Sequence, residues 1–299
     1  MSAAGLAARA ADPGLAGGTG VVRKSWREIL WTSFVWALMA FFLINVAGVI
    51  ASVAVNSFGT RWFATWLPAG FTTRWYFTAW DDFQLYDVLV VTFEVVFAVV
   101  IISVVVGVPA AYALARRDFI GKRAVLLLFV IPLLVPPITY GIPLATVLYQ
   151  SGVGGTLAGV ILANLVPSVP FVVLVMTPFI EQVDPRLEAA ARVFGAGLGR
   201  MFVHVLVPLL APGILAAALL VLVRTIAMFE LSFLTAGPDS QTLVVVLYYS
   251  VFAAGVRAGQ SIDAMAVIYM VTTLVWLLVA LRFVNPTQLV TRVKEQRRA

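Results

Sequence analysis

The sequence predicts an all-α, polytopic membrane protein with six transmembrane helices and both termini in the cytoplasm. Of its 299 residues, 62% are hydrophobic and only 11% are charged, and the mean hydropathy is +1.02. A soluble domain carries about 25% charged residues and roughly 45–50% apolar ones. One soluble core could not hide so much apolar surface, so lipid is the expected solvent. The composition therefore disfavours a soluble enzyme, a disordered chain and a collagen-like fibre.

Six apolar stretches are long enough to cross a bilayer, which takes about 20 mostly apolar residues. They cover residues 29–55, 88–115, 124–149, 157–180, 206–235 and 262–284. The apolar stretch 242–254 is too short to span and is expected to be a re-entrant or interfacial segment. The first stretch is too long for a signal-peptide core and has no clear cleavage site after it, so it should stay as an anchor.

The basic residues separate the loops into two sides. Sixteen of the 20 lie in four regions, residues 1–28, 116–123, 181–205 and 282–299. The opposite loops hold only Arg61, Arg74 and Arg257, and Arg224 alone lies inside a span. Because Lys and Arg collect in cytoplasmic loops, this bias predicts that both termini are cytoplasmic.

These signals divide the chain into four parts. Residues 1–28 and 285–299 are expected to be cytoplasmic tails, the first of them disordered. Residues 29–87 hold the first transmembrane helix and an extracytoplasmic segment, whose many aromatics suggest an interfacial belt with a small cap. Residues 88–284 form a core of five transmembrane helices.

Enzyme signatures are missing from the sequence. With no cysteine, disulfides, thiolate catalysis and Cys-ligated metals are excluded. The sequence has no GxxxxGK[ST], HExxH or GxSxG pattern, so ATP hydrolysis by this chain itself is not expected. Its single histidine, His204, is expected to be a surface or packing residue. We therefore expect no catalytic residue, no metal site, no cofactor bound by this chain and, with a net charge of only +6, no nucleic-acid partner.

The longest interior cytoplasmic loop, within residues 181–207, predicts two short helices. Asp184 is the expected N-cap of the first, with Pro185 at its first position. Its small and apolar side chains then fall on one face, at Leu187, Ala190, Ala191 and Phe194. Glycines 195, 197 and 199 should break or bend it before a second helix starts near Arg200. Such a helix, parallel to the membrane, suits a groove on a cytoplasmic protein.

This loop resembles that of ABC importer permeases of the binding-protein-dependent, MetI-like family. Their loop reads EAA, three residues, Gly, nine residues, then Ile-x-Leu-Pro. The matching positions here are Ala189, Ala190, Ala191, Gly195, Val205, Val207 and Pro208. Ala189 stands where the family has its acid, and Glu188 comes one residue earlier, so whether Glu188 replaces that acid stays open. The resemblance covers about residues 85–285 and includes the Pro-rich run 131–143 and the run 224–243.

The resemblance implies a non-catalytic transmembrane subunit of a type I importer in the cell (inner) membrane. The loop would be its coupling helix, moved by two separate ATPase subunits that bind ATP and Mg. A second permease subunit, expected to form a heterodimer although a homodimer stays open, and an extracytoplasmic solute-binding protein would complete the assembly. An ion-driven secondary transporter is the alternative class, and it predicts broken helices around a midplane site.

Two features of the sequence bear on the substrate and its pathway: a sequence run after the fifth span begins, and the charges inside the spans. The run FELSFLTAGPDSQTL, residues 229–243, resembles permeases of the spermidine/putrescine-type branch, which implies a polyamine-like or other small organic solute. A sugar or polyol permease is the alternative. Charges inside spans are costly and usually face a cavity or a partner. Arg224 and Glu230 lie deep enough to line a translocation pathway or to pair with a neighbouring helix, whereas Glu94 and Asp263 can reach interfacial water.

Overall fold

The computed structural model describes residues 26–62, 65–252 and 258–283, and this part of the chain is helical with connecting turns. Its one β-type pairing is an isolated bridge between Gly59 and Phe71. The chain divides into two compact units, Met1–Ala51 and Ser52–Ala299. The described part of the first unit is the N-terminal portion of helix α1 (Trp26–Phe58). The sites described below all lie in the second unit.

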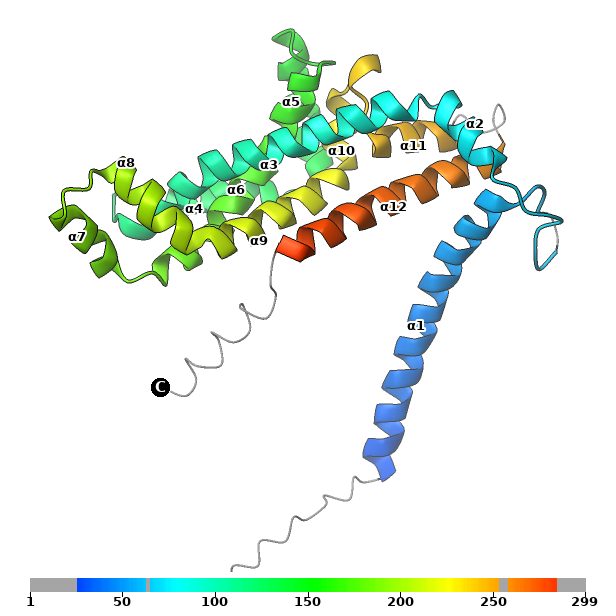
Figure 1. Cartoon of the computed structure of the whole chain (residues 1–299), viewed down its shortest axis with the longest axis horizontal. Coiled ribbons are helices and arrows are strands. Elements are labelled where there is room, and N and C mark those ends of the chain that lie inside the picture. The colour runs from blue at the N-terminus through cyan, green and yellow to red at the C-terminus, as the bar shows by residue number, and fades with distance from the viewer. Residues whose placement is uncertain (1–25, 63–64, 253–257, 284–299) are drawn as a thin grey trace, which may run out of the picture. The chain divides into compact units, whose positions relative to one another are not determined.

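Long apolar helices run side by side through the second unit (Figure 1). They are α3 (Leu85–Arg116), α6 (Leu157–Glu181), α9 (Val207–Ile226) and α12 (Gly259–Phe283). Counting α1, five helices of the described chain are long and apolar enough to cross a membrane, or six if a bent pair counts as one span. The multi-span prediction is therefore confirmed at five to six candidate spans.

The core of the second unit lies where α3, α6 and α9 meet. Fully buried side chains from all three fill it, among them Val99, Val172, Met176 and Val221. At Gly107 of α3, an added Cβ would lie 2.7 Å from Cγ1 of Val172 on α6. Because glycine weakens a helix interior, its place here is explained by the close approach of the two helices.

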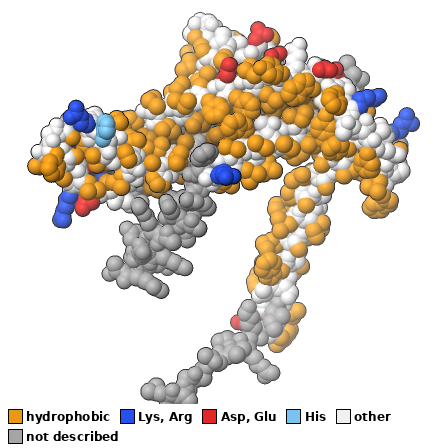
Figure 2. Space-filling view, viewed as in Figure 1, with side chains coloured by type: hydrophobic (Ala, Val, Ile, Leu, Met, Phe, Trp, Pro, Cys, Tyr) orange, Lys and Arg blue, Asp and Glu red, His pale blue; other side chains and the backbone are white. Residues whose placement is uncertain are grey.

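Short helices cap the two ends of this unit. The short helices α7 (Pro185–Val193) and α8 (Leu198–Met201) lie together at one end. A π-helical turn, Phe202–Leu206, joins α8 to α9. At the other end lie α2 (Arg74–Asp82) and α11 (Leu243–Phe252), the latter matching the predicted non-spanning stretch 242–254. Figure 2 shows hydrophobic side chains along most of the visible length, with the single His at the α7–α8 end and Lys or Arg side chains at both ends.

The single helix expected over 124–149 is interrupted, although its two halves together still count as one candidate span. Two helices, α4 (Lys122–Leu134) and α5 (Pro137–Gln150), cover this stretch and meet at a bend of 101°. Val135 and Pro136 between them have extended backbone. Two successive prolines remove two backbone donors, and the first pushes the residue before it out of the helical region.

The predicted span 206–235 is wrong at its C-terminal end. Its main helix, α9, begins at Val207 as expected and follows α8 and the π-helical turn in one helical run over Leu198–Ile226. It stops at Ala227 and Met228, and a separate helix, α10 (Phe229–Thr235), follows. Neither residue at the break is Pro or Gly, and Met228 has extended backbone with its side chain buried in a cluster with Leu148 and Leu231. Tertiary packing rather than local sequence accounts for this break.

The remaining boundaries are close to prediction, with one further correction. The spans expected at 88–115, 157–180 and 262–284 correspond to α3, α6 and α12. Gly197 is the N-cap of α8 and Gly199 lies inside α8, so the predicted break at Gly199 is wrong. The tail 285–299, and residues 1–25 of the other predicted tail, lie outside the described residues.

Candidate functional site

Helix α7 is bounded by two local signals in its sequence. At its start, the Asp184 carboxylate accepts a hydrogen bond from the backbone N–H of Arg186 at 2.9 Å, and Pro185 is the first helical residue. The predicted N-cap is thus confirmed. At its end, the Gly195 N–H donates to Arg192 O at 2.9 Å and the Ala196 N–H donates to Ala191 O at 3.0 Å. This pair of bonds is a Schellman motif.

Gly195, the motif glycine, closes this helix in the left-handed region, with φ of +81°. A Cβ at this position would meet nothing within 4 Å, so backbone conformation and not space demands glycine there. The motif spacing places Gly195 at this position, and its left-handed backbone is the physical reason for the residue type.

The Gly195→Ala variant should lower stability by about 1 kcal/mol, the cost of a left-handed L-residue. Gly199→Ala is the matched control, because its Cβ also meets nothing within 4 Å but its backbone is helical. That control should be neutral or stabilising. Thermal unfolding of the purified chain measures both, and equal midpoints for the two variants would contradict the left-handed requirement.

The apolar face of α7 points away from the rest of the second unit. Leu187 is 47% exposed, Val193 85% and Phe194 90%, and Ala190 is also exposed. Of the four residues expected to share one face, Ala191 alone is half-buried and packs against the core. Three arginines near this face are also exposed: Arg186, Arg192 and Arg200.

The acid of α7 points inward instead. Glu188 is 6% exposed, and it is the one ionisable side chain in the buried class among the described residues. Its Oε1 accepts from Arg116 Nε at 2.7 Å, and its Oε2 accepts from the Tyr112 hydroxyl at 2.8 Å. Ala189, which stands at the family's acid position, is exposed. Sequence reasoning missed Tyr112 and Arg116, since nothing local in α3 marks them as partners of α7.

The second half of the motif leads into α9. Val205 and Val207 are half-buried and Pro208 is exposed. The fully buried side chains of this segment are Met201 and Leu206, which the motif does not include. The motif residues Val205, Val207 and Pro208 are therefore consecutive parts of the helical segment that enters α9. Most of its core packing comes from their neighbours Met201 and Leu206.

A cleft of about 640 Å³ separates α7 from the end of α3. Its lining is polar and rich in arginine: Tyr112, Arg116, Arg117, Asp118, Pro185, Glu188, Ala189 and Arg192. Asp118 pairs with Lys122 at 3.0 Å and is almost fully exposed.

The two deep charges lie on either side of the break between α9 and α10. Arg224 and Glu230 are both half-buried, and the Arg224 guanidinium lies 5.6 Å from the centroid of the Phe171 ring. Tyr140 of α5 packs against the apolar cluster that includes Met228 at this break. The Tyr140 hydroxyl is buried and has no hydrogen-bond partner within the described chain. The break between α9 and α10 thus lies between a cation and an anion, beside a tyrosine whose hydroxyl is unsatisfied within the described chain.

The predicted alternative of an ion pair for these two charges is not found within the described residues. The other two span charges differ from each other. Glu94 is exposed on α3, whereas Asp263 is half-buried and accepts a hydrogen bond from the Asn56 side chain. Asp263 therefore has a protein partner where interfacial water was expected.

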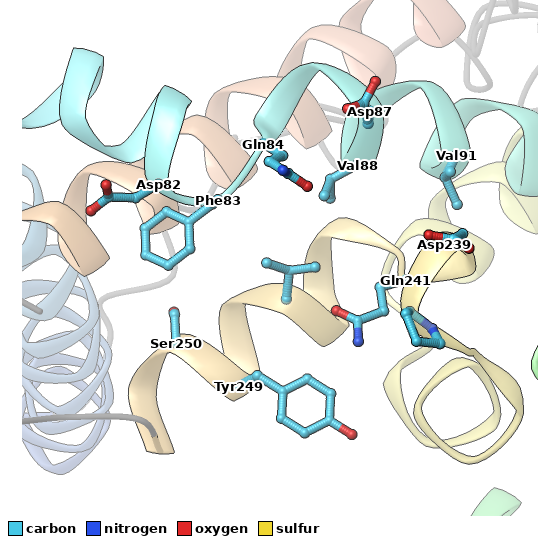
Figure 3. Close-up of a pocket in the computed structure, with 12 residues that line it drawn as sticks. Asp82, Phe83, Gln84, Asp87, Val88, Val91, Asp239, Gln241, Tyr249 and Ser250 are labelled. Atoms are coloured by element: carbon cyan, nitrogen blue, oxygen red, sulfur yellow. The ribbon is translucent and has the colours of Figure 1, made fainter. Parts of the chain in front are cut away.

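A second cleft, of about 610 Å³, opens at the opposite end of the unit. Its walls are the α2–α3 junction on one side and the segment leading into α11 on the other (Figure 3). Carboxylates and amides dominate its polar lining: Asp82, Gln84, Asp87, Asp239 and Gln241. The two ends of the unit therefore differ in charge, with a basic cleft beside α7 and an acidic one beside α11.

Three comparisons relate this chain to known proteins. It is 31% identical over 171 residues to the molybdate/tungstate transport system permease protein WtpB of Thermococcus kodakarensis, covering 57% of this chain and 68% of that one. It is 36% identical over 123 residues to the trehalose transport system permease protein SugB of Mycobacterium tuberculosis, covering 41% of this chain and 45% of that one. Its fold matches a bacterial ABC transporter involved in the import of the acidic polysaccharide alginate, with a TM-score of 0.71, 16% identity, and coverage of 86% of this chain and 98% of that one.

The family model of the binding-protein-dependent transport system inner membrane component matches residues 103–293. That stretch contains the C-terminal part of α3, helices α4 to α12, the α7 loop and the Arg224–Glu230 break. Members of this family are transport permeases rather than enzymes. The chain therefore belongs to the binding-protein-dependent inner membrane permeases of ABC importers.

Proposed function

We propose that α7 is the coupling helix of this permease, through which separate ATPase subunits drive transport. The observation that supports this is the exposed apolar face of α7. An amphipathic helix of a folded domain normally buries its apolar face and exposes its charges. Here Phe194 and Val193 are exposed while Glu188 is buried. An exposed apolar face on a helix so firmly capped is best explained by a protein that covers it.

The proposed orientation places the α7 end in the cytoplasm with both chain termini, as the positive-inside rule predicts. The α2–α11 end then faces outward, where the binding protein delivers solute. A second permease subunit, which we propose to be a different chain, would complete the pathway. ATP and Mg would bind to the ATPase subunits.

We further propose that Arg224, Tyr140 and Glu230 lie along the solute pathway. Backbone interrupted at membrane depth is tolerated where it borders protein or a polar cavity. The α4–α5 bend and the α9–α10 break are two such interruptions, and the Tyr140 hydroxyl of α5 lacks a partner within the described chain. A polar solute would provide the missing hydrogen bonds as it passes.

The solute that suits this cluster is a small organic molecule, neutral or of mixed charge. A polyamine, the expectation from residues 229–243, is not the substrate named for either relative above. A sugar or polyol is a second candidate, favoured by contiguous rings on α10 and α11. Phe229, Phe233 and Tyr248 are in mutual ring contact, with centroids 4.7–5.2 Å apart.

The test is solute uptake into vesicles by the complete transporter, with and without its ATPase subunits. Uptake should require both ATP and the ATPase. The Arg224→Ala variant should lower uptake by about tenfold, a typical cost of 1–2 kcal/mol for a lost charged contact. Arg282→Ala, which removes an exposed arginine near the end of α12, is the control and should leave uptake unchanged.

Uptake driven by an ion gradient without the ATPase would contradict the proposed mechanism and favour a secondary transporter. Equal uptake by the two arginine variants would contradict the pathway assignment alone. Ligand binding by the partner binding protein, measured with spermidine, trehalose and molybdate as probes, separates the solute classes.

A further inference from the structure

The buried acid Glu188 joins α7 to a transmembrane helix. Both of its carboxylate oxygens are engaged, one by Arg116 and one by Tyr112. Those two residues lie one turn apart in the last two turns of α3. Within the described chain, these are the side-chain hydrogen bonds that connect α7 to a transmembrane helix.

Arg116 also holds the segment that enters α7. Its Nη2 donates to the Val183 carbonyl at 2.6 Å, just before the Asp184 N-cap. Tyr112 reaches the segment that leaves α7, because its ring meets that of Phe202 edge-on at 5.6 Å between centroids. The end of α3 is therefore attached before, within and after the loop helix.

These attachments are strong because they are charge-assisted and shielded. The side chains of Arg116 and Glu188 are 14% and 8% exposed. Removing one partner of such a pair leaves the other charge buried without compensation. Charge-assisted hydrogen bonds are also stronger than neutral ones.

We infer that Glu188 and Arg116 are positioning residues that make α7 and α3 move as one body. This inference rests on the proposed coupling role of α7. A push on the exposed face of α7 is then transmitted through the pair to α3, and from α3 to α6 across their close contact at Gly107. Without the pair, the loop could shift while the transmembrane helices stay in place.

These contacts also distinguish the role of Glu188 from that of the family's acid. Its carboxylate is turned toward α3 and is not offered to a cytoplasmic partner. Ala189 at the acid position has no charge to offer, although its side chain is exposed. The acid of this loop therefore acts within the permease.

The test uses the complete transporter and two readouts, ATP hydrolysis and solute imported per ATP. Glu188→Gln and Arg116→Ala should keep the ATPase bound and hydrolysing. Solute imported per ATP should fall by about tenfold, within the usual range of coupling free energies. The double variant Arg116→Glu with Glu188→Arg should recover most of the loss. Asp118→Ala, which removes an exposed acid from the rim of the same cleft, is the control and should have no effect.

Tyr112→Phe removes one hydroxyl only, so it tests the inference even if the charge variants do not fold. It should lower solute per ATP by a smaller factor while leaving ATP hydrolysis unchanged. Unchanged coupling in all these variants, or loss of ATPase binding by Glu188→Gln, would overturn the inference. Failure of the unmodified chain to couple ATP to uptake would instead overturn the proposed function, so the two failures are distinguishable.

Discussion

Replacing Ala190 with Arg should abolish ATP-driven uptake while leaving the chain folded and inserted. Ala190 is exposed on the apolar face of α7 beside Leu187 and Phe194. A small residue there allows close approach of a partner, and a long cation would hold the ATPase away. Central interface positions cost about 2 kcal/mol or more when disrupted, roughly 30-fold in affinity. Co-purification of the ATPase and vesicle uptake measure the effect.

Ala69→Arg provides the matched control for that variant. Ala69 is exposed in the described segment before α2, at the opposite end from α7. The control should keep the ATPase bound at the unmodified level. Equal ATPase binding by the two variants would contradict the docking role of the α7 face.

Replacing Gly107 with Leu should prevent the chain from folding. Even the first atom of the new side chain would lie 2.7 Å from Cγ1 and 2.8 Å from Cβ of Val172. Both helices are long and buried at this point, so neither can give way locally. Overpacking of a core by one methyl group costs about 1–3 kcal/mol, and Leu adds three further carbons. The yield of monodisperse protein in detergent measures the outcome.

Two other variants calibrate this prediction. Gly107→Ala should fold but melt at a lower temperature, because Val172 must shift to accept a Cβ that would lie 2.7 Å from its Cγ1. Ala113→Leu, on an exposed position of the same helix, should purify normally. Normal yield of Gly107→Leu would show that α3 and α6 do not approach this closely.

The sequence predicts the long helices well because each is an apolar run that ends near charges or turn residues. The start and end of α7 were also readable, from Asp184-Pro185 and from Gly195. These signals are local, so a single sequence contains them. The break at Pro136-Pro137 was present in the residues too, but the apolar run continues on both sides and hides it.

Other features depend on contacts between distant segments and have no local signal. The break at Met228 arises from packing against α5 and α6. Helical periodicity correctly places Leu187, Ala190 and Phe194 on one face of α7. It does not determine that this face is exposed rather than packed against the other helices. The partner of Glu188 lies 72 residues earlier in the chain, at Arg116. Helical periodicity identifies faces, and only the tertiary structure determines what each face meets.

The most direct test of the central claim, that α7 contacts the ATPase, is site-directed photocrosslinking. The chain has no cysteine, so one introduced at Ala190 can carry a maleimide-linked benzophenone without side reactions. With the assembled transporter, the Ala190→Cys probe should crosslink to the ATPase subunit, and an Ala69→Cys probe should not. An intact complex in which the Ala190 probe yields no ATPase adduct, or in which only the Ala69 probe does, would contradict the claim.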